Sequence, residues 1–438
     1  MSCRDAEAVK ICLDISEPGN ISWSFLCRRP AMREMKRSPK SRFITSIPAI
    51  IARAIAVVAL LALCGTTPAA SDNAKLAPAN AHRRSIAPWP WRQAGFDAAH
   101  TAYNRFEQIL SRSNVGLLTQ AWASPVGVGA LYASPIVAAG RVYIGSGDGR
   151  MYAFDAATGA TLWIGDQQPL FFVDSAAVGE GLVFASAVYQ PLVAYNAETG
   201  SIVWTSSLSS VRASPTLAHG VLYVASSDGT LNALDAATGV SIWSTSRQAG
   251  VFDQAPMVDG GRVFQMRTDH TLTAYDAKDG TELWRKPAFS IGTIAASHGT
   301  LFYSEYPNVV ALDEATGAQL WAAPVLMAAT AGSPAVANGL VFVTQAKLWA
   351  LDAATGAVVW TAPATSTWGP VVANGVVYAS SLNGEWDAFD ERNGSLLWSV
   401  TVGSGCGGAC AQTVPVVANG VLYLAGFDQY LRAFAISR

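Results

Sequence analysis

The sequence predicts an all-β fold, an eight-bladed β-propeller of four-stranded antiparallel blades, and three observations support this prediction. Seven segments of eleven residues superpose without a gap, and each ends in Gly-x-x-x-Trp. Pairs of short alternating strands and tight turns fill the intervals between them. From one tryptophan to the next, the repeat is 37 to 41 residues, close to the roughly 40 residues of one propeller blade. A supersecondary unit that recurs at such regular spacing is typical of a closed repeat architecture.

The repeated segments predict a β-hairpin in each blade. They are AFDAATGATLW (153–163), AYNAETGSIVW (194–204), ALDAATGVSIW (233–243), AYDAKDGTELW (274–284), ALDEATGAQLW (311–321), ALDAATGAVVW (350–360) and AFDERNGSLLW (388–398). In each segment an alternating strand ends in Asp or Asn, whose side chain can accept hydrogen bonds from the turn backbone. Glycine follows four residues later and supplies the positive φ that such a loop requires. We therefore interpret these Asp and Asn residues as turn residues, not as catalytic acids.

The tryptophans predict both the packing and the number of the blades. Each stands on an outer strand, where its ring can wedge between neighbouring blades. The unit 414–438 has three strands and no final Trp, whereas residues 114–122 read as an outer strand that ends in Trp122. An N-terminal strand should therefore close the last blade and remove the free sheet edges of the ring. The predicted docking residues are Trp122, Trp163, Trp204, Trp243, Trp284, Trp321, Trp360 and Trp398, at spacings of 41, 41, 39, 41, 37, 39 and 38.

The N-terminal region predicts export. Basic residues between Arg33 and Arg42 precede an apolar run of 11 residues, Ala54 to Cys64, as in a secretory signal peptide. The run is shorter than the roughly 20 residues of a membrane-spanning helix, so we predict no transmembrane span in the mature chain. Two alternatives remain open, ordinary cleavage between Ala69 and Ala81 or lipid attachment at Cys64, since Leu61-Ala62-Leu63-Cys64 resembles a bacterial lipobox. Translation from Met32 or Met35 would leave the preceding stretch unused.

We therefore divide the chain into a leader (1–70), an entry segment (71–110) and the propeller (111–438), and we expect an exported monomer in the periplasm, at the cell surface or outside the cell. Beyond Arg53 there are 19 Lys and Arg against 26 Asp and Glu, a balance of 19 − 26 = −7. This charge argues against a nucleic-acid partner, because phosphates require clustered basic residues. In an oxidising compartment, Cys406 and Cys410 are a candidate disulfide.

Residues 89–438 resemble the pyrroloquinoline-quinone (PQQ)-type propeller repeat superfamily. The A-x-D-x-x-T-G-x-x-x-W units resemble its tryptophan-docking motif, and Trp91-Arg92-Gln93-Ala94-Gly95, with Asn104 and Glu107, resembles its entry segment. The superfamily includes quinone-dependent alcohol dehydrogenases and the outer-membrane-protein assembly lipoprotein of the BamB type, so the resemblance implies the fold more firmly than the function. Its dehydrogenases carry two adjacent cysteines over the quinone, whereas three residues separate Cys406 from Cys410 here.

Aligning the blades on the Pro of their Ser-Pro pairs gathers polar residues on one face around the central channel. Candidate catalytic residues are Asp174 and Asp253, as a general base or calcium ligand, and Arg212, as their electrostatic partner. Candidate cofactor-binding residues are Trp368, as a stacking floor for a quinone, with Gln254 and Glu305. Arg267, His270 and Tyr306 fall in neighbouring loops of the same face.

The alternative is a structural role, in which Asp174, Arg212 and Asp253 form a satisfied network at the channel mouth and Arg267 pairs with Glu305 across adjacent blades. No His and Cys cluster has metal-ligand spacing, and the metal ligands remain unknown.

Two functions are compatible with these observations. The first is a non-catalytic exported propeller that binds a protein or another envelope partner, with no cofactor implied. The second is a PQQ- and calcium-dependent dehydrogenase that oxidises an alcohol or polyol. We favour the first, because the blades are minimal, carry no long inserted loops and lack the adjacent cysteines of the dehydrogenases.

Overall fold

The computed structural model describes residues 90–437, except 128–132, 167–173, 188–189, 209, 212, 248–253, 290–291, 328–331, 365, 367, 382–383, 403–412 and 427. The predicted leader, Cys64, Arg212, Asp253, Cys406 and Cys410 lie outside the described residues. Within the described ranges, no helix has the length and apolar character needed to cross a membrane.

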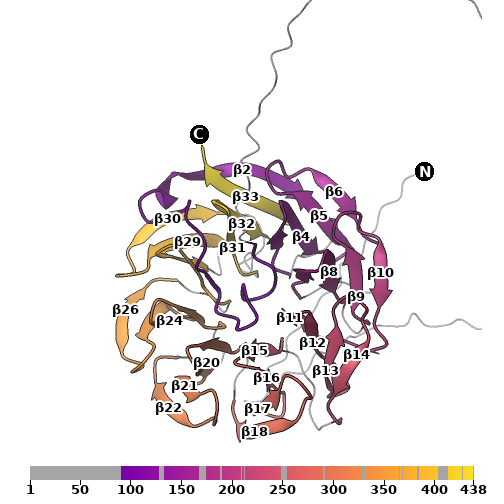
Figure 1. Ribbon diagram of the computed structural model, residues 1–438. Helices are drawn as coiled ribbons and strands as arrows, with labels where there is room; N and C mark the ends of the chain where they lie inside the picture. Colours follow the sequence, from indigo (N-terminus) through magenta and orange to yellow (C-terminus); the bar gives the residue numbers. More distant parts are fainter. Residues whose placement is uncertain are drawn as a thin grey trace, which may run out of the picture. The chain divides into compact units, whose positions relative to one another are not determined.

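Eight sheets succeed one another around a ring, each with an antiparallel four-stranded core (Figure 1). The innermost strands of blades 1 to 8 are β3 (Ile136–Ala138), β7 (Ala177–Gly179), β11 (Thr216–Ala218), β15 (Met257–Asp259), β19 (Ala295–Ser297), β23 (Ala335–Ala337), β27 (Val371–Ala373) and β31 (Val416–Ala418). The second strands are β4 (Arg141–Gly145), β8 (Leu182–Ala185), β12 (Val221–Ala225), β16 (Arg262–Met266), β20 (Thr300–Glu305), β24 (Leu340–Thr344), β28 (Val376–Ser380) and β32 (Val421–Ala425).

The outer half of each blade contains the repeated hairpin. The third strands are β5 (Met151–Asp155), β9 (Val193–Asn196), β13 (Leu231–Asp235), β17 (Thr271–Asp276), β21 (Asn308–Asp313), β25 (Leu348–Asp352), β29 (Glu385–Asp390) and β33 (Tyr430–Ile436). The outer strands are β6 (Thr161–Ile164), β10 (Ile202–Thr205), β14 (Ser241–Ser244), β18 (Glu282–Pro287), β22 (Gln319–Ala323), β26 (Val358–Ala362), β30 (Leu396–Thr401) and, for blade 8, β2 (Leu118–Pro125). A short strand β1 (Tyr103–Asn104) and a 3₁₀ turn η1 (Val115–Leu117) precede β2.

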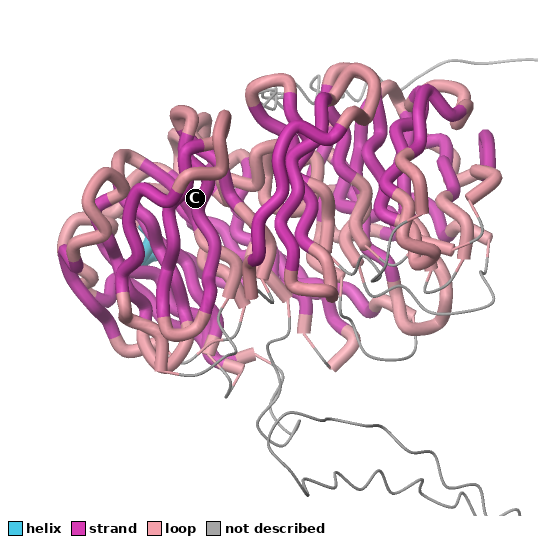
Figure 2. Tube along the Cα trace, turned by 90° about the horizontal axis from the view of Figure 1, so that it is seen from below, coloured by secondary structure: helices cyan, strands magenta, loops and turns pink. Residues whose placement is uncertain are grey.

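The chain order gives the ring two faces, and turns line both rims in the edge view of Figure 2. Loops into the innermost strands and turns between second and third strands lie on one face, which we call the entry face. The turns that follow the first and third strands lie on the opposite face, which we call the motif face. On the motif face the turn between β23 and β24 has φ of 50° at Asn338 and 79° at Gly339, the left-handed pair typical of a two-residue hairpin.

Blade 8 is completed by the N-terminal strand, as predicted. Strand β2 pairs antiparallel with β33 from Leu118–Ile436 to Pro125–Tyr430. The two strands lie side by side at the rim of the ring in Figure 1. The Trp398 indole of blade 7 then donates to the Leu118 carbonyl at 3.2 Å. The prediction of an eight-bladed propeller closed from the N-terminus is therefore confirmed.

Each docking tryptophan except Trp398 contacts the next blade at the same place. Its indole Nε1 donates to the backbone carbonyl of the residue that follows the motif Asp or Asn, as Trp163 does to Ala197 at 3.0 Å. The other donors are Trp122, Trp204, Trp243, Trp284, Trp321 and Trp360, with acceptors Ala156, Ala236, Ala277, Glu314, Ala353 and Glu391. A docked indole therefore has both a packing surface and a satisfied N–H group.

The segment before β2 fills the centre of the ring. We call residues 91–107 the plug segment, which runs as an indigo trace inside the ring in Figure 1. The middle residue of each of the first seven innermost strands donates its backbone N–H to this segment, in chain order. The acceptors are the carbonyls of Trp91 and Arg92, the side-chain oxygen of Gln93, and the carbonyls of Ala98, Ala99, Thr101 and Ala102, at 2.7 to 2.9 Å.

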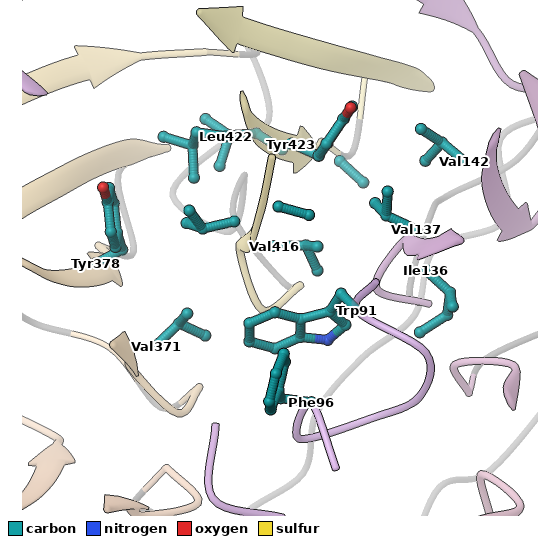
Figure 3. Packing of buried hydrophobic residues seen from close by; sticks show 14 of the residues in the cluster. Trp91, Phe96, Ile136, Val137, Val142, Val371, Tyr378, Val416, Leu422 and Tyr423 are labelled. Atoms are coloured by element: carbon teal, nitrogen blue, oxygen red, sulfur yellow. The ribbon is translucent and has the colours of Figure 1, made fainter. Parts of the chain in front are cut away.

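Blade 8 is contacted by side chains of the plug segment. The Asn104 amide donates to the Val417 carbonyl at 2.8 Å, and the Glu107 carboxylate accepts from Gly420 N at 3.0 Å. All eight blades therefore bind one continuous stretch of chain. This stretch also supplies an apolar centre, because the Trp91 indole packs edge-on against Phe96 with ring centroids 5.1 Å apart. Figure 3 shows this pair among Val137, Val371 and Val416.

Candidate functional site

Three of the residues assigned from sequence occupy one register around the entry face. Asp174, Gln254 and Trp368 each lie three residues before an innermost strand, in blades 2, 4 and 7. All three are partly buried. The other two catalytic candidates, Asp253 and its proposed electrostatic partner Arg212, lie outside the described residues. With Glu305 of blade 5, the described part of this predicted site is therefore two acids, one amide and one indole.

The backbone at two of these positions is held by neighbouring strands. The Trp368 carbonyl accepts hydrogen bonds from Thr344 Oγ1 at 2.5 Å and Ser366 Oγ at 3.3 Å, and its N–H donates to Ser366 Oγ at 3.1 Å. The Gln254 carbonyl accepts from Gln265 Nε2 at 3.0 Å. These hydrogen bonds hold the backbone of Trp368 and Gln254 in place.

Arg267 and Glu305, on blades 4 and 5, have different partners from those expected in the structural alternative. The buried Arg267 guanidinium pairs with Asp269 of its own turn, with 3.4 Å between Nη2 and Oδ2. The Glu305 carboxylate accepts from Phe289 N at 3.3 Å and from the Tyr303 hydroxyl at 3.0 Å. Burial, together with the charge of Glu305, raises the pKa of Tyr303, so this phenol remains a hydrogen-bond donor.

Next to Glu305, large side chains project from the entry face. Phe289, Tyr306 and Met327 are 60%, 54% and 63% exposed. His270 stacks on Phe289 with ring centroids 4.8 Å apart and 28° between the ring planes. We call these four residues the entry-face ridge.

Backbone contacts join the parts of the entry-face ridge. The Phe289 N–H donates to the carboxylate of Glu305, the residue before Tyr306. Leu326 N donates to the Pro307 carbonyl at 3.0 Å, and Met327 N donates to Gln345 Oε1 at 2.6 Å. The ridge therefore spans blades 4 to 6 and is held to the rigid strands by hydrogen bonds rather than by burial of its side chains.

Family models match the whole described propeller. The model described as outer membrane protein assembly factor BamB matches residues 170–252, 249–306, 268–366 and 306–437. The model described as the β-propeller domain of glucose/ethanol/alcohol dehydrogenase matches residues 91–171. The chain belongs to the PQQ-type β-propeller superfamily. The resemblance inferred from the docking motif is therefore confirmed.

The curated relatives of this PQQ-type propeller fall into the same two groups. It is 30% identical over 230 residues to quinohemoprotein alcohol dehydrogenase ADH-IIG of Pseudomonas putida, a match that covers 50% of this chain and 27% of the relative. It is 28% identical over 314 residues to outer membrane protein assembly factor BamB of Moranella endobia, covering 69% of this chain and 63% of the relative. The chain thus matches only part of the length of each.

Solved structures show the same fold in both groups. The quinohemoprotein alcohol dehydrogenase of Comamonas testosteroni superposes with a TM-score of 0.65 at 15% identity, covering 81% of this chain and 82% of that one. BamB from Moraxella catarrhalis superposes with a TM-score of 0.59 at 17% identity, covering 73% of this chain and 99% of that one. At these identities the superpositions establish the fold of the PQQ-type propeller alone.

Sequence reasoning identified two residues of the entry-face ridge, His270 and Tyr306, but not Phe289 and Met327. The missed residues lie in the loops that lead from β18 to β19 and from β22 to β23. The sequence signal that could have identified them is a large apolar residue in a loop that must lie on the surface. Their proximity, however, depends on the hydrogen bonds between blades.

Proposed function

We propose that this chain is an exported, non-catalytic propeller that binds a protein partner through the entry-face ridge. The observation that carries this proposal is the group of large side chains there, of which Phe289, Tyr306 and Met327 are each more than half exposed. Aromatic residues and Met are enriched at protein interfaces, where a few such side chains provide most of the binding energy.

The anchoring of the ridge supports the same proposal. Its backbone is tied to Glu305, Pro307 and Gln345 by the hydrogen bonds described above. A partner that covers the ridge would bury apolar area on residues whose backbone is already hydrogen-bonded, and such preorganisation lowers the entropic cost of association. The relatives named as outer membrane protein assembly factors favour a protein as the partner.

Site-specific photo-crosslinking in cells that express the full chain tests this proposal. A photoreactive residue at Tyr306 is expected to give one discrete adduct with a protein, and Phe289→Asp should abolish it by placing a charge in the contact. The matched control is the same photoreactive residue at Val240, which is 64% exposed beyond the Asp-x-x-x-Gly turn of blade 3. It should give no such adduct.

The identified partner then allows a quantitative measurement with purified proteins. We expect Phe289→Asp and Tyr306→Ala each to weaken binding at least tenfold, a loss of about 1.4 kcal/mol or more, as for central interface residues. Val240→Ala should leave the affinity unchanged. Equal affinities for all the variants, or adducts that form as readily at Val240, would remove the ridge from the proposal.

The second candidate is a PQQ- and calcium-dependent dehydrogenase, which the Pseudomonas putida relative favours. The described residues supply Asp174, Gln254, Glu305 and Trp368 for such a site. They contain no group of three His, Cys, Asp or Glu residues suited to a metal ion. The fit therefore depends on Arg212 and Asp253.

Titration with PQQ and calcium separates the two candidates. Binding is measured by quinone absorbance and by thermal stability. Saturable binding that is lost in Trp368→Ala and Asp253→Ala would favour the dehydrogenase. The non-catalytic proposal expects no binding at tens of micromolar.

A further inference from the structure

A pocket of about 490 Å³ opens on the motif face, opposite the entry-face ridge, where the plug segment meets blades 5 and 6. Its wall combines Tyr103 and Arg105 of the plug segment with His298, Thr300, Phe302 and Asn338 of the two blades. The volume lies within the range of roughly 300–1,000 Å³ that is typical of small-molecule sites.

The positive charge of Arg105 is available to a ligand. The side chain is exposed, and its guanidinium carbon lies 5.0 Å from the centroid of the Phe106 ring. In the described part of the chain, the ion pairs involve other arginines, and Arg105 makes none. A guanidinium presents a planar set of donors that matches a carboxylate.

The polar groups beside Arg105 have defined orientations. The Tyr103 hydroxyl donates to Asn338 Oδ1 at 3.1 Å, and Asn338 Nδ2 donates to Glu391 Oε1 at 2.7 Å. The Asn338 amide therefore stands between the Glu391 carboxylate and the Tyr103 hydroxyl. Across the pocket, His298 Nδ1 and Ser297 Oγ are 2.8 Å apart, which leaves the other ring nitrogen of His298 without a described partner.

The remaining wall is apolar. Phe302, Val336 and Ala337 belong to strands β20 and β23 and are buried. We propose that this pocket binds a small organic carboxylate, with Arg105 pairing to the carboxylate and this apolar wall receiving the body of the ligand. The site is independent of the proposed partner surface, because it lies on the other face.

Binding of 2-naphthoate to the full chain tests this proposal, with neutral 2-naphthamide as the matched ligand. Ligand-observed NMR should show saturable binding of naphthoate with a Kd of about 1 mM or tighter, the range expected for a ligand of this size. Arg105→Gln should weaken it at least tenfold, because a charge-assisted hydrogen bond is lost. Naphthamide should bind wild type at least tenfold more weakly than naphthoate.

Arg92→Gln is the control variant, because Arg92 is an exposed arginine of the same plug segment that does not line the pocket. It should bind naphthoate like wild type. A second variant, Ala354→Trp, adds bulk at an exposed wall residue and should block binding without touching the core. Naphthoate that fails to saturate, or that binds Arg105→Gln or Ala354→Trp as it binds wild type, overturns the proposal.

Discussion

The motif glycines show how a single missing side chain serves two purposes. Gly200 has a φ of 74°, which the turn requires, and a Cβ placed on it would lie 2.5 Å from the Trp163 ring of the preceding blade. A Cβ placed on any of the other six motif glycines would likewise lie 2.5 to 2.9 Å from the ring of the preceding tryptophan. The sequence predicted the turn, since glycine at this offset is a local signal, but the contact with the ring involves another blade and is not visible locally.

His100 is the residue for which the clearest pH dependence is expected. Its ring is buried in the plug segment, with Nε2 3.3 Å from Thr216 Oγ1, and burial lowers its pKa to about 4 from an ordinary 6.5. Below pH 6.5 the unfolded chain therefore binds a proton that the folded chain does not bind until about pH 4. The contribution of His100 to the free energy of unfolding is therefore fully present above pH 6.5. It falls by about 3 kcal/mol on acidification to pH 4.

Chemical unfolding of wild type and His100→Gln between pH 7 and pH 4 measures this effect. Between pH 7 and pH 4, the free energy of unfolding of the variant should fall by about 3 kcal/mol less than that of wild type. His219→Asn changes an exposed histidine to the residue found at three equivalent turns, and it should retain the wild-type pH dependence. Parallel pH profiles for wild type and His100→Gln would contradict the assignment.

At the level of the element, the outer strands share one irregularity. In every blade the pairing register shifts immediately before the docking tryptophan, for example between Trp163 and Thr161, which leaves Leu162 as a bulge. The same shift occurs at Val203, Ile242, Leu283, Leu320, Val359, Leu397 and Ala121. A bulge increases the local twist and interrupts the ladder. Edge strands with exposed aliphatic residues thereby become poor templates for pairing with another chain.

The docking contact should be a principal source of blade-to-blade stability. Trp163 is 7% exposed and donates to Ala197 of the next blade, whereas Ile164 on the same strand is 49% exposed. Trp163→Ala should reduce the free energy of unfolding by roughly 3–5 kcal/mol, as for other buried aromatic truncations. Ile164→Ala should change it by less than about 0.5 kcal/mol. Comparable losses in the two variants, measured by chemical denaturation, would refute a special role for the indole.

For the molecule as a whole, the plug segment joins blades that otherwise contact only their neighbours. The entry segment predicted from sequence includes Trp91, Gln93, Asn104 and Glu107. The first three contact innermost strands, and Glu107 contacts Gly420 in the turn that follows β31. Their position inside the ring was not predicted, because the segment has no repeat and most of its bonds use backbone carbonyls. The eight blades were predictable for the opposite reason, since each contains the same local turn, strand and tryptophan.

Hydrogen exchange followed by mass spectrometry tests whether the plug segment acts as one unit. Trp91 is 2% exposed, so Trp91→Ala should loosen the segment. We expect faster exchange of the central amides of the innermost strands around the whole ring, from Val137 to Val372, because all of them donate to that segment. The control is Leu117→Ala, at a position that is 62% exposed, which should leave the exchange rates of these amides unchanged. Faster exchange confined to blade 1 would show that the segment is not cooperative.

The plug segment also has a consequence for how such a ring can change its number of repeats. A duplicated blade would bring one more innermost strand whose central N–H group faces the centre, and the seven successive acceptors between Trp91 and Ala102 are already matched to seven donors. A lost blade would leave an acceptor of the segment without its donor. Gain or loss of a repeat therefore requires a simultaneous change in the length of the plug segment, which is itself not repeated. The number of blades is thus specified both by the repeats and by the number of acceptors in the plug segment.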